Sequence, residues 1–235
     1  MTIKLFNLNL WNYTKWKVRR PKILRAIKKY NPDIIAFQEI RDDVRFNKKG
    51  DNQLKQLNKA LKYPYYAFYQ VADKRKGFPE KYKQYCVEGT GILSKFPILK
   101  VERKRLKKHK NDRYICGNLY AKIKSEKTFD LVAVHFSNTD LFSKLHLIET
   151  LKWIKSKKIN PIIVGDFNMW RQNVLHKLTG NKFKSSVKFK KYLSYPLRQW
   201  TLDYVLIPKE FYFKSFKCLN ERLSDHRALF AEIDF

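Results

Sequence analysis

The amino-acid sequence predicts an α/β (α+β) protein built from two packed mixed β-sheets with helices on their outer faces. Short apolar runs bounded by polar residues, which are typical of strands, outnumber the segments with helical periodicity. Predicted strands and helices follow one another in a similar order in both halves of the chain. Two stacked sheets with flanking helices are the natural way for such elements to share one core. A length of 235 residues without a Gly/Ser linker or Pro-rich tract leads us to expect a single domain over residues 1–235.

The first half of the chain begins with a predicted strand at residues 3–8 and continues with a predicted helix at residues 21–30. Pro21 suits the first turn of that helix, and apolar residues recur behind it at helical spacing. The continuous apolar run at residues 34–37 predicts a short strand that is buried on both faces. A further helix and three strands are expected, in that order, at residues 53–61, 65–70, 90–94 and 98–103.

The second half carries one long predicted helix, at residues 141–155, whose apolar residues recur at helical spacing. Strands are expected on both sides of this helix, at residues 114–123, 129–136, 162–164, 204–207, 211–216 and 228–233.

The charge of the chain is strongly unbalanced, with 51 basic against 21 acidic residues and a formal net charge of +30. An AT-rich genome would enrich lysine, but it would enrich glutamate as well, so codon bias alone does not explain the imbalance. Such a charge predicts a polyanionic partner, and nucleic acid, either DNA or RNA, is favoured over an anionic membrane surface.

Three basic runs, at residues 72–84, 103–113 and 182–192, contain much of this charge. Phe183 and Phe189 are interleaved with the lysines of the last run, a pattern typical of a groove that follows a nucleic-acid backbone and stacks its bases. A solvated loop is the alternative interpretation of each run taken alone.

Several classes of protein are excluded by composition. No apolar run approaches the ~20 residues of a membrane span, so no stable membrane insertion is expected. The N-terminus lacks the pattern of a secretory signal, and the three cysteines fit neither a zinc spacing nor a disulfide framework. We therefore expect an intracellular, cytoplasmic protein with buried, reduced cysteines.

Polar clusters stand at the edges of four apolar runs, where they add nothing to burial. They are Gln38-Glu39, Gly165-Asp166-Phe167-Asn168, Asp203 and Ser224-Asp225-His226. Carboxylates, amides and an imidazole are the groups that hold a divalent cation and act on a phosphate. Taken singly, each of them is more typical of a turn, a cap or a solvated strand end. Together they predict one polar site at the rim of a sheet.

The order of these clusters resembles the endonuclease/exonuclease/phosphatase (deoxyribonuclease I-like) superfamily. That superfamily includes deoxyribonuclease I, exonuclease III-type repair endonucleases, neutral sphingomyelinases and inositol polyphosphate 5-phosphatases. The resemblance rests, in chain order, on Phe6-Asn7, Gln38-Glu39, Gly91-Ile92-Leu93-Ser94, His135, Gly165-Asp166-Phe167-Asn168, Leu202-Asp203-Tyr204 and Ser224-Asp225-His226. It implies a four-layered α/β sandwich, a single catalytic domain over residues 1–235, and phosphoester hydrolysis that depends on Mg²⁺ or Mn²⁺.

The resemblance also assigns metal and phosphate ligands. Glu39 would be the principal ligand of the metal, with Asp225 and Asn9 nearby. Asn7 and Asn168 would hold the phosphate.

The remaining polar residues receive catalytic roles from the same resemblance. Asp166 would align or activate the attacking water. His226, paired with Asp203, would act as general base or stabilise the transition state, so Asp166 and His226 both qualify as the base. His135, with Glu88 behind it, would protonate the leaving oxygen or hold a non-bridging one.

Aromatic residues follow two of the polar strand ends. Trp11, with Tyr13 and Trp16, comes after the Asn7 strand, Trp170 follows Asn168, and Trp200 precedes Asp203. Stacking on substrate bases is the functional interpretation, and packing within loops is the alternative.

The branches of the family give mixed indications of the substrate. His135 matches deoxyribonuclease I and the sphingomyelinases, whereas Trp200 resembles the pocket aromatic of the repair enzymes, which have Asp where this chain has Asn9. We expect a monomeric Mg²⁺-dependent nuclease. The alternatives are a sphingomyelinase-like phosphodiesterase or phosphatase acting on phospholipid head groups or inositol phosphates, and a catalytically vestigial nucleic-acid-binding module.

Overall fold

Two six-stranded mixed sheets form the centre of the molecule, as the sequence predicts. The computed structural model describes residues 1–73, 84–180 and 182–235. The first sheet has the order β11 (Tyr212–Leu219), β12 (Ala228–Asp234), β1 (Thr2–Asn9), β2 (Ile34–Asp43), β4 (Cys86–Ser94) and β3 (Tyr65–Asp73). The second sheet has the order β5 (Ile98–Arg105), β6 (Gly117–Lys124), β7 (Thr128–His135), β8 (Ile162–Asp166), β10 (Asp203–Pro208) and β9 (Phe183–Ser185).

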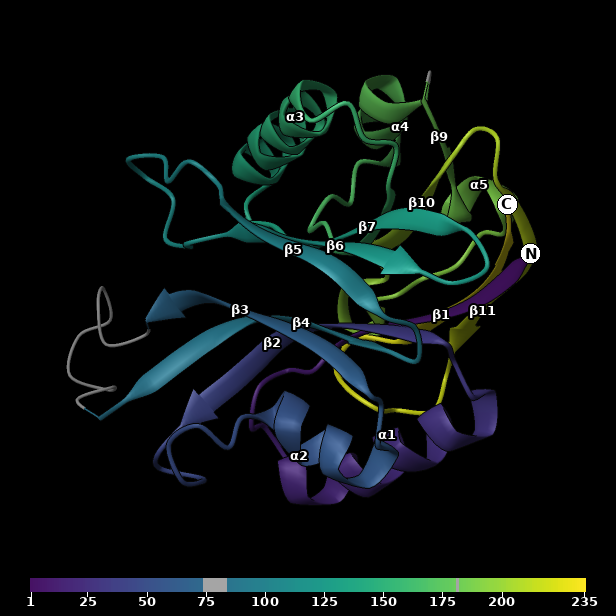
Figure 1. Cartoon of the computed structure of the whole chain (residues 1–235). Coiled ribbons are helices and arrows are strands. Elements are labelled where there is room, and N and C mark those ends of the chain that lie inside the picture. Colours follow the sequence, from purple (N-terminus) through teal and green to yellow (C-terminus); the bar gives the residue numbers. More distant parts are fainter. Residues whose placement is uncertain (74–83, 181) are drawn as a thin grey trace.

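Helices cover the outer face of each sheet, which gives four layers (Figure 1). The helices α1 (Trp16–Tyr30) and α2 (Gln53–Leu61) lie on the first sheet, and α3 (Asp140–Ser156) and α4 (Gln172–Thr179) lie on the second. The short helix α5 (Ser186–Phe189) and a 3₁₀ turn (Pro196–Arg198) lie between β9 and β10 in the chain. The two termini lie side by side at one end of the sandwich (Figure 1).

The core consists of apolar side chains from both faces of the central strands. Leu5 and Ala36 point between the sheets, whereas their neighbours Phe6 and Phe37 point toward α1 and α2. Burial on both faces explains why these strands read as continuous apolar runs. Each fully buried side chain of the size of Leu5 or Phe6 contributes about 1.5–3 kcal/mol.

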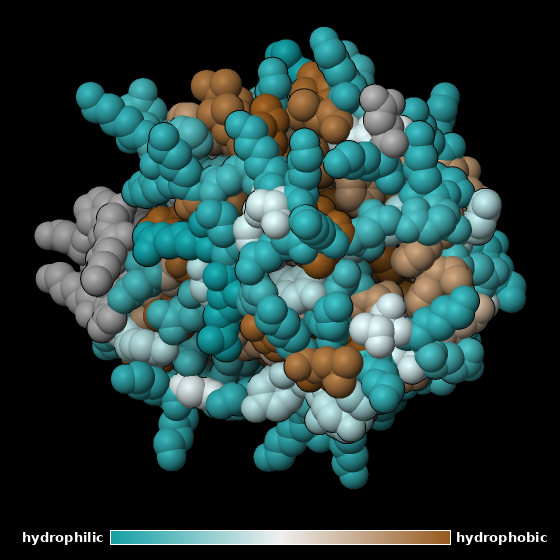
Figure 2. Space-filling view, turned by 45° about the horizontal axis from the view of Figure 1, so that its top comes forward, coloured by the Kyte–Doolittle hydropathy of each residue, from teal (hydrophilic) through white to brown (hydrophobic). Residues whose placement is uncertain are grey.

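Outside the core the molecule is mainly hydrophilic on the face shown in Figure 2, with smaller hydrophobic areas between the polar side chains. Cys86, Cys116 and Cys218, all of which lie in the described residues, form no disulfide there. In the described part of the chain, no helix is long and apolar enough to cross a membrane.

Strand pairing brings the polar strand ends to one edge. The parallel pairs β1–β2 and β7–β8 place Asn9 beside Gln38 and His135 beside Asp166. The antiparallel strand β10 begins at the same edge, with Asp203 opposite Asp166. The carboxyl ends of the parallel strands therefore meet the starts of their antiparallel neighbours at one end of both sheets.

Several element boundaries differ from those predicted. Helix α1 begins at Trp16, so Pro21 lies inside the helix and not in its first turn. The residue before the helix is Lys15, whose side chain provides no cap, and no acidic residue occupies the first turn, so the sequence carries no start signal there. Strand β2 continues past Phe37 as far as Asp43 because a bulge keeps it paired with β4.

The basic runs are not simple loops, because parts of them belong to strands or helices. Most of the run at 72–84 lies outside the described residues, and its first two residues belong to β3. The run at 182–192 contains the short elements β9 and α5, which the sequence pattern does not predict. Phe183 is buried beneath α3 and α4, whereas Phe189 is 50% exposed, so only Phe189 of the two is available for stacking.

A buried histidine on α3 generates a prediction about stability and pH. The Nδ1 atom of His146 accepts a hydrogen bond from the backbone N–H of Ser137 at 3.3 Å, and the side chain is 1% exposed. Burial lowers the pKa of His146 below its usual 6.5, although the nearby Asp112 carboxylate acts in the opposite direction. The contribution of neutral His146 to the free energy of unfolding is therefore fully present above pH 6.5, the usual pKa of histidine. It is lost as the pH falls through the pKa of His146 in the folded protein, which is lower.

We expect the free energy of unfolding to fall below pH 6.5 by up to about 1.4 kcal/mol per pH unit from this group. Urea denaturation from pH 7.5 to 5 measures the slope in the wild type and in His146→Gln. The difference between the two slopes isolates His146 from the other titrating groups, and identical slopes would contradict the prediction.

Candidate active site

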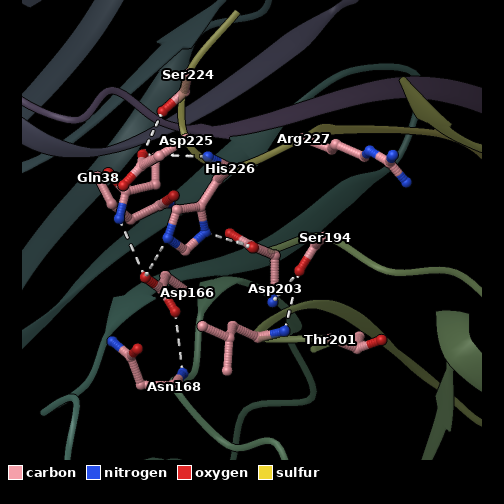
Figure 3. A network of polar contacts seen from close by, with 12 residues as sticks. Gln38, Asp166, Asn168, Ser194, Thr201, Asp203, Ser224, Asp225, His226 and Arg227 are labelled. Carbon is pink, nitrogen blue, oxygen red and sulfur yellow. Dashed lines mark hydrogen bonds and ion pairs between the residues drawn. The ribbon is translucent and has the colours of Figure 1, made fainter. Parts of the chain in front are cut away.

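A cavity of about 480 Å³ opens at the edge where the polar strand ends meet. Both sheets contribute to its walls, together with the loops that follow β7 and β8. The predicted site residues that line it are Glu39, Glu88, His135, Asp166, Asn168, Trp170, Trp200, Asp225 and His226. Figure 3 shows the polar network around Asp166 and His226.

Asp166 ends β8 and is 1% exposed. Its Oδ1 accepts the backbone N–H of Asn168 at 2.9 Å, and its Oδ2 accepts the Asn9 amide at 3.0 Å. Burial raises the pKa of Asp166 to about 6, although the neighbouring His226 acts against this rise. A carboxylate with that pKa can both bind and release a proton near neutral pH.

Gly165 fixes the direction in which Asp166 points. Its φ of 145° is unfavourable for a side chain, and a Cβ atom there would lie 2.0 Å from the carbonyl oxygen of Val134. Only glycine lets β8 run this close to β7 at the residue before the carboxylate.

Asp203 and His226 form a buried pair beside Asp166 (Figure 3). The Nδ1 atom of His226 donates to Asp203 Oδ2 at 2.8 Å, and its Nε2 atom lies 3.8 Å from Asp166 Oδ2. Burial alone would lower the pKa of His226, but the carboxylates of Asp203 and Asp166 together raise it to about 10. At neutral pH this imidazole is therefore a cation.

Glu39 reaches the cavity through the bulge in β2. The pairing of β2 with β4 shifts between Phe37 and Ile40, and Glu39 has a φ of 51°. Bulges re-aim side chains in this way beside active sites. Its Oε1 accepts the Asn9 amide at 3.1 Å, so one amide group bridges Glu39 of the first sheet and Asp166 of the second.

Asn7 and Asn9 share a face of β1, but the structure brings only Asn9 to the site. Neither of the two asparagines lines the cavity, but Asn9 contacts Glu39 and Asp166, whereas the amide oxygen of the fully buried Asn7 accepts from Gln38 Nε2 at 2.9 Å. The amide oxygen of Asn9 accepts the backbone N–H of Trp11 at 2.9 Å. This bond turns the NH₂ group of Asn9, and not its oxygen, toward the two carboxylates.

Two groups of residues could hold a cation. Glu39 and Asp225 are half-buried carboxylates on the cavity wall, and Asp225 Oδ1 accepts the Ser224 hydroxyl at 2.8 Å. Deeper in the site, ligand atoms of Asp166, Asp203 and His226 all lie within 4.8 Å of one another. The Oδ1 atom of Asp203 in this second group is buried and has no hydrogen-bond partner among the residues that the structure describes. The first group offers hard oxygen ligands that open toward solvent, which suits Mg²⁺.

His135 ends β7 with its Nε2 atom 3.7 Å from Asp166 Oδ2, and its side chain is 23% exposed to the cavity. Glu88 lies on the same cavity, where its carboxylate forms an ion pair with Arg41 at 2.8 Å. The structure thus gives Glu88 a partner other than His135. Arg41, which also lines the cavity, was not predicted from the sequence. Its position on β2, two residues after Glu39, could have indicated it as a site residue.

A pair of tryptophans forms one rim of the cavity. Trp170 and Trp200 stack with ring centroids 5.7 Å apart at 19°, and they are 40% and 37% exposed. The Arg171 guanidinium lies 4.7 Å from the Trp170 ring centroid, and that of Arg198 lies 5.8 Å from the Trp200 centroid. Trp11 does not line the cavity, and its ring lies instead against Arg19.

Other lining residues were not found from the sequence. They are Tyr114, Phe136, Asn138, Tyr195 and Arg198. Basic residues, aromatic residues and asparagines are abundant throughout the chain, so no local signal separates these from the rest.

The sequence and the fold of the chain resemble those of known proteins. Residues 6–226 match the model of the endonuclease/exonuclease/phosphatase family. A search of curated protein sequences found no match to the chain.

Solved structures resemble the chain over almost its whole length. The human Nocturnin catalytic domain with bound sulfate has a TM-score of 0.75 at 19% identity, covering 100% of this chain and 94% of that chain. A Bacteroides thetaiotaomicron mannosyl-6-phosphatase has a TM-score of 0.75 at 16% identity, covering 99% and 100%. D. rerio TDP2 complexed with a single-strand DNA product has a TM-score of 0.74 at 15% identity, covering 100% and 99%. At these identities the likeness shows a shared fold.

The close approach at Gly165 generates a prediction. We expect Gly165→Ala to lower the free energy of unfolding by about 2–5 kcal/mol, since it adds a backbone clash to an unfavourable φ. Gly50→Ala is the matched control, because Gly50 also has a positive φ of 89° but has open space around its Cβ position. The control should cost about 1 kcal/mol. Equal losses in chemical denaturation would show that the contact with Val134 does not matter.

Proposed function

Because the chain belongs to the endonuclease/exonuclease/phosphatase family, whose members hydrolyse phosphoester bonds, we propose that it is a metal-dependent nuclease that cleaves DNA or RNA. One observation carries the proposal. Asp166 and His226, which form a buried group with Asp203, line the same cavity as the stacked pair Trp170 and Trp200. Acid–base groups for phosphate chemistry thus lie beside a surface on which a base can stack.

Members of this family typically depend on a divalent cation. Glu39 and Asp225 would hold Mg²⁺ or Mn²⁺, since Mg²⁺ is commonly bound by one or two carboxylates and keeps several waters. When bound, the cation supplies Lewis acidity and helps to position the phosphate. Asn9 would contribute by holding Glu39 and Asp166 in place, because its amide oxygen is engaged by Trp11.

Asp166 is the better of the two candidates for the base. Both of its oxygens accept hydrogen bonds that orient it, and its pKa of about 6 lies close to neutral pH. His226 is already protonated at neutral pH, so it would stabilise negative charge that develops on the phosphate. Asp203 would keep the imidazole charged and oriented.

The other predicted residues take supporting roles in this proposal. His135, on the cavity wall, would donate to a phosphate oxygen or to the leaving oxygen. Asn168 donates one amide N–H to the Phe136 carbonyl at 3.0 Å, which leaves its second N–H for the phosphate. Glu88 would position Arg41 on the wall, and Asn7 would support Gln38 beneath the site.

A second candidate function is hydrolysis of a small phosphorylated metabolite. A cavity of about 480 Å³ lies within the usual size of small-molecule sites, and one protein of the same fold is a mannosyl-6-phosphatase. The net charge of +30 supports the nuclease over this alternative, since a small phosphate needs no such field.

The deciding experiment incubates the protein, with Mg²⁺ or with EDTA, with labelled single-stranded DNA, duplex DNA and RNA. Parallel reactions contain sphingomyelin, inositol phosphates and sugar phosphates. We expect cleavage of nucleic acid that EDTA abolishes. Hydrolysis of a lipid or a metabolite alone would contradict the proposal, and binding of nucleic acid without any hydrolysis would favour a vestigial enzyme.

Substitutions at the buried group test its proposed chemistry. We expect Asp166→Asn and His226→Gln each to lower kcat on an oligonucleotide by about 10²–10⁴-fold, as loss of a proton-transfer or charge-stabilising group does. Glu102→Gln, which removes a carboxylate paired with Lys100 on β5, is the control and should leave kcat unchanged. Full activity in Asp166→Asn would contradict the assignment of Asp166 as the base.

The tryptophan pair generates a separate prediction. Trp200→Ala should raise KM for an oligonucleotide about tenfold while kcat changes little, because base stacking on an aromatic ring contributes about 1–3 kcal/mol to binding. Trp153→Ala, a tryptophan of α3 outside the cavity, controls for general loss of packing. An unchanged KM in Trp200→Ala would remove the tryptophans from the substrate site.

A further inference from the structure

A second pocket, of about 570 Å³, lies outside the candidate active site. It is formed by the start of α1, the turn before it, the loop that joins β2 to α2, and α2 itself. Its lining residues are Tyr13, Lys15, Trp16, Lys17, Val18, Arg20, Phe46, Asn47 and Gln56. None of these described lining residues is acidic, in contrast to the active-site cavity.

Aromatic rings form the walls of this second pocket. Tyr13 and Phe46 stack with centroids 4.7 Å apart at 14°, and Trp16 meets Tyr13 edge to face at 6.2 Å and 87°. The Tyr13 hydroxyl accepts hydrogen bonds from Asn47 and Gln56, both at 2.9 Å, and the Trp16 indole N–H donates to Gln56 at 2.8 Å. These bonds hold the rings in place before any ligand arrives.

The rim of the second pocket combines exposed apolar and cationic groups. Phe46 is 56% exposed and Val18 is 62% exposed, and both stand beside the exposed side chains of Lys15, Lys17 and Arg20. Helix α1 contains no acidic residue along its whole length. Such a surface is complementary to a ligand that is anionic and also carries a flat aromatic group.

The turn between β1 and α1 links the second pocket to the active site. Asn12 donates to Glu39 Oε2 at 3.4 Å, and the Arg19 side chain donates to the carbonyls of Trp11 and Asn12 at 3.3 and 3.0 Å. Tyr13 follows Asn9 by four residues, so their Cα atoms lie at most about 15 Å apart. A strand whose phosphate lies in the cavity can therefore reach the second pocket within a few nucleotides.

We propose that the second pocket binds a base of the substrate strand, a few nucleotides from the phosphate that is cleaved. Phe46 stacks on the base, and Lys15, Lys17 and Arg20 contact the adjacent phosphates. Bases in a duplex are already stacked and paired, so this pocket makes single-stranded nucleic acid the preferred substrate. The inference rests on the proposed nuclease function, and it assigns to Tyr13 and Trp16 a role outside the catalytic cavity.

The test compares binding and cleavage in Phe46→Ala with the wild type. Fluorescence anisotropy in EDTA measures the Kd for a single-stranded 12-mer without cleavage. Turnover of a dinucleotide, which has no nucleotide beyond the two that flank the cleaved bond, measures the chemistry. We expect Phe46→Ala to weaken 12-mer binding about tenfold and to leave dinucleotide turnover unchanged. Phe46→Trp, which keeps a stacking surface, should restore binding.

Tyr212→Ala is the matched control, because Tyr212 is also an exposed aromatic residue beside a lysine, but it lies at the other end of the first sheet, opposite Asp234. It should leave the 12-mer Kd unchanged. Equal Kd values for wild type and Phe46→Ala would overturn the inference. Loss of binding to phosphatidylserine vesicles in Phe46→Ala, with an unchanged 12-mer Kd, would overturn it in favour of a membrane surface. Failure of the nuclease proposal would be seen separately, as the absence of turnover of either substrate by the wild type.

Discussion

The amide group of Asn9 lies between two carboxylates that belong to different sheets, and the geometry of the site depends on this contact. It donates to Glu39 on the first sheet at 3.1 Å and to Asp166 on the second at 3.0 Å. Without a donor between them, two carboxylates at the seam of the sandwich would repel each other in surroundings of low dielectric. The backbone of Trp11 fixes the orientation of the amide, so the turn after β1 takes part in building the site. The two sheets thus meet at the point where the proposed metal ligand Glu39 and the proposed base Asp166 lie together.

The charged groups in the deeper part of the site are stabilised because they pair with one another. Asp166 and Asp203 are almost fully buried, and the cation of His226 lies between them. Removing such groups from water costs several kcal/mol for each ion, and mutual attraction offsets this cost only in part. The apolar core between the sheets provides the stability that makes such a cluster tolerable. The same pairing raises the pKa of His226 to about 10, well above that of Asp166, which is about 6, and this difference supports the separate roles proposed for the two residues.

Most strands and the positions of the polar strand ends could be predicted from the sequence, because burial on both faces leaves continuous apolar runs. The side chains that reach the site, and the directions in which they point, could not be predicted from the sequence. Asn7 and Asn9 have the same side-chain direction on β1, and only the end of the strand decides which of them reaches Asp166. The bulge that aims Glu39 leaves no mark in the hydrophobic pattern. The stacking of Trp170 on Trp200 depends on two loops that the fold brings together.

The most direct test of the contact across the seam is a double-mutant cycle. It measures the free energy of unfolding of the wild type, Asn9→Ala, Asp166→Asn and the double variant at pH 8, where Asp166 is ionised. A hydrogen bond from Asn9 to a buried carboxylate predicts a coupling energy of about 1–3 kcal/mol between the two positions. Additive effects, with no coupling between Asn9 and Asp166, would contradict the view that this amide joins the two sheets at the site.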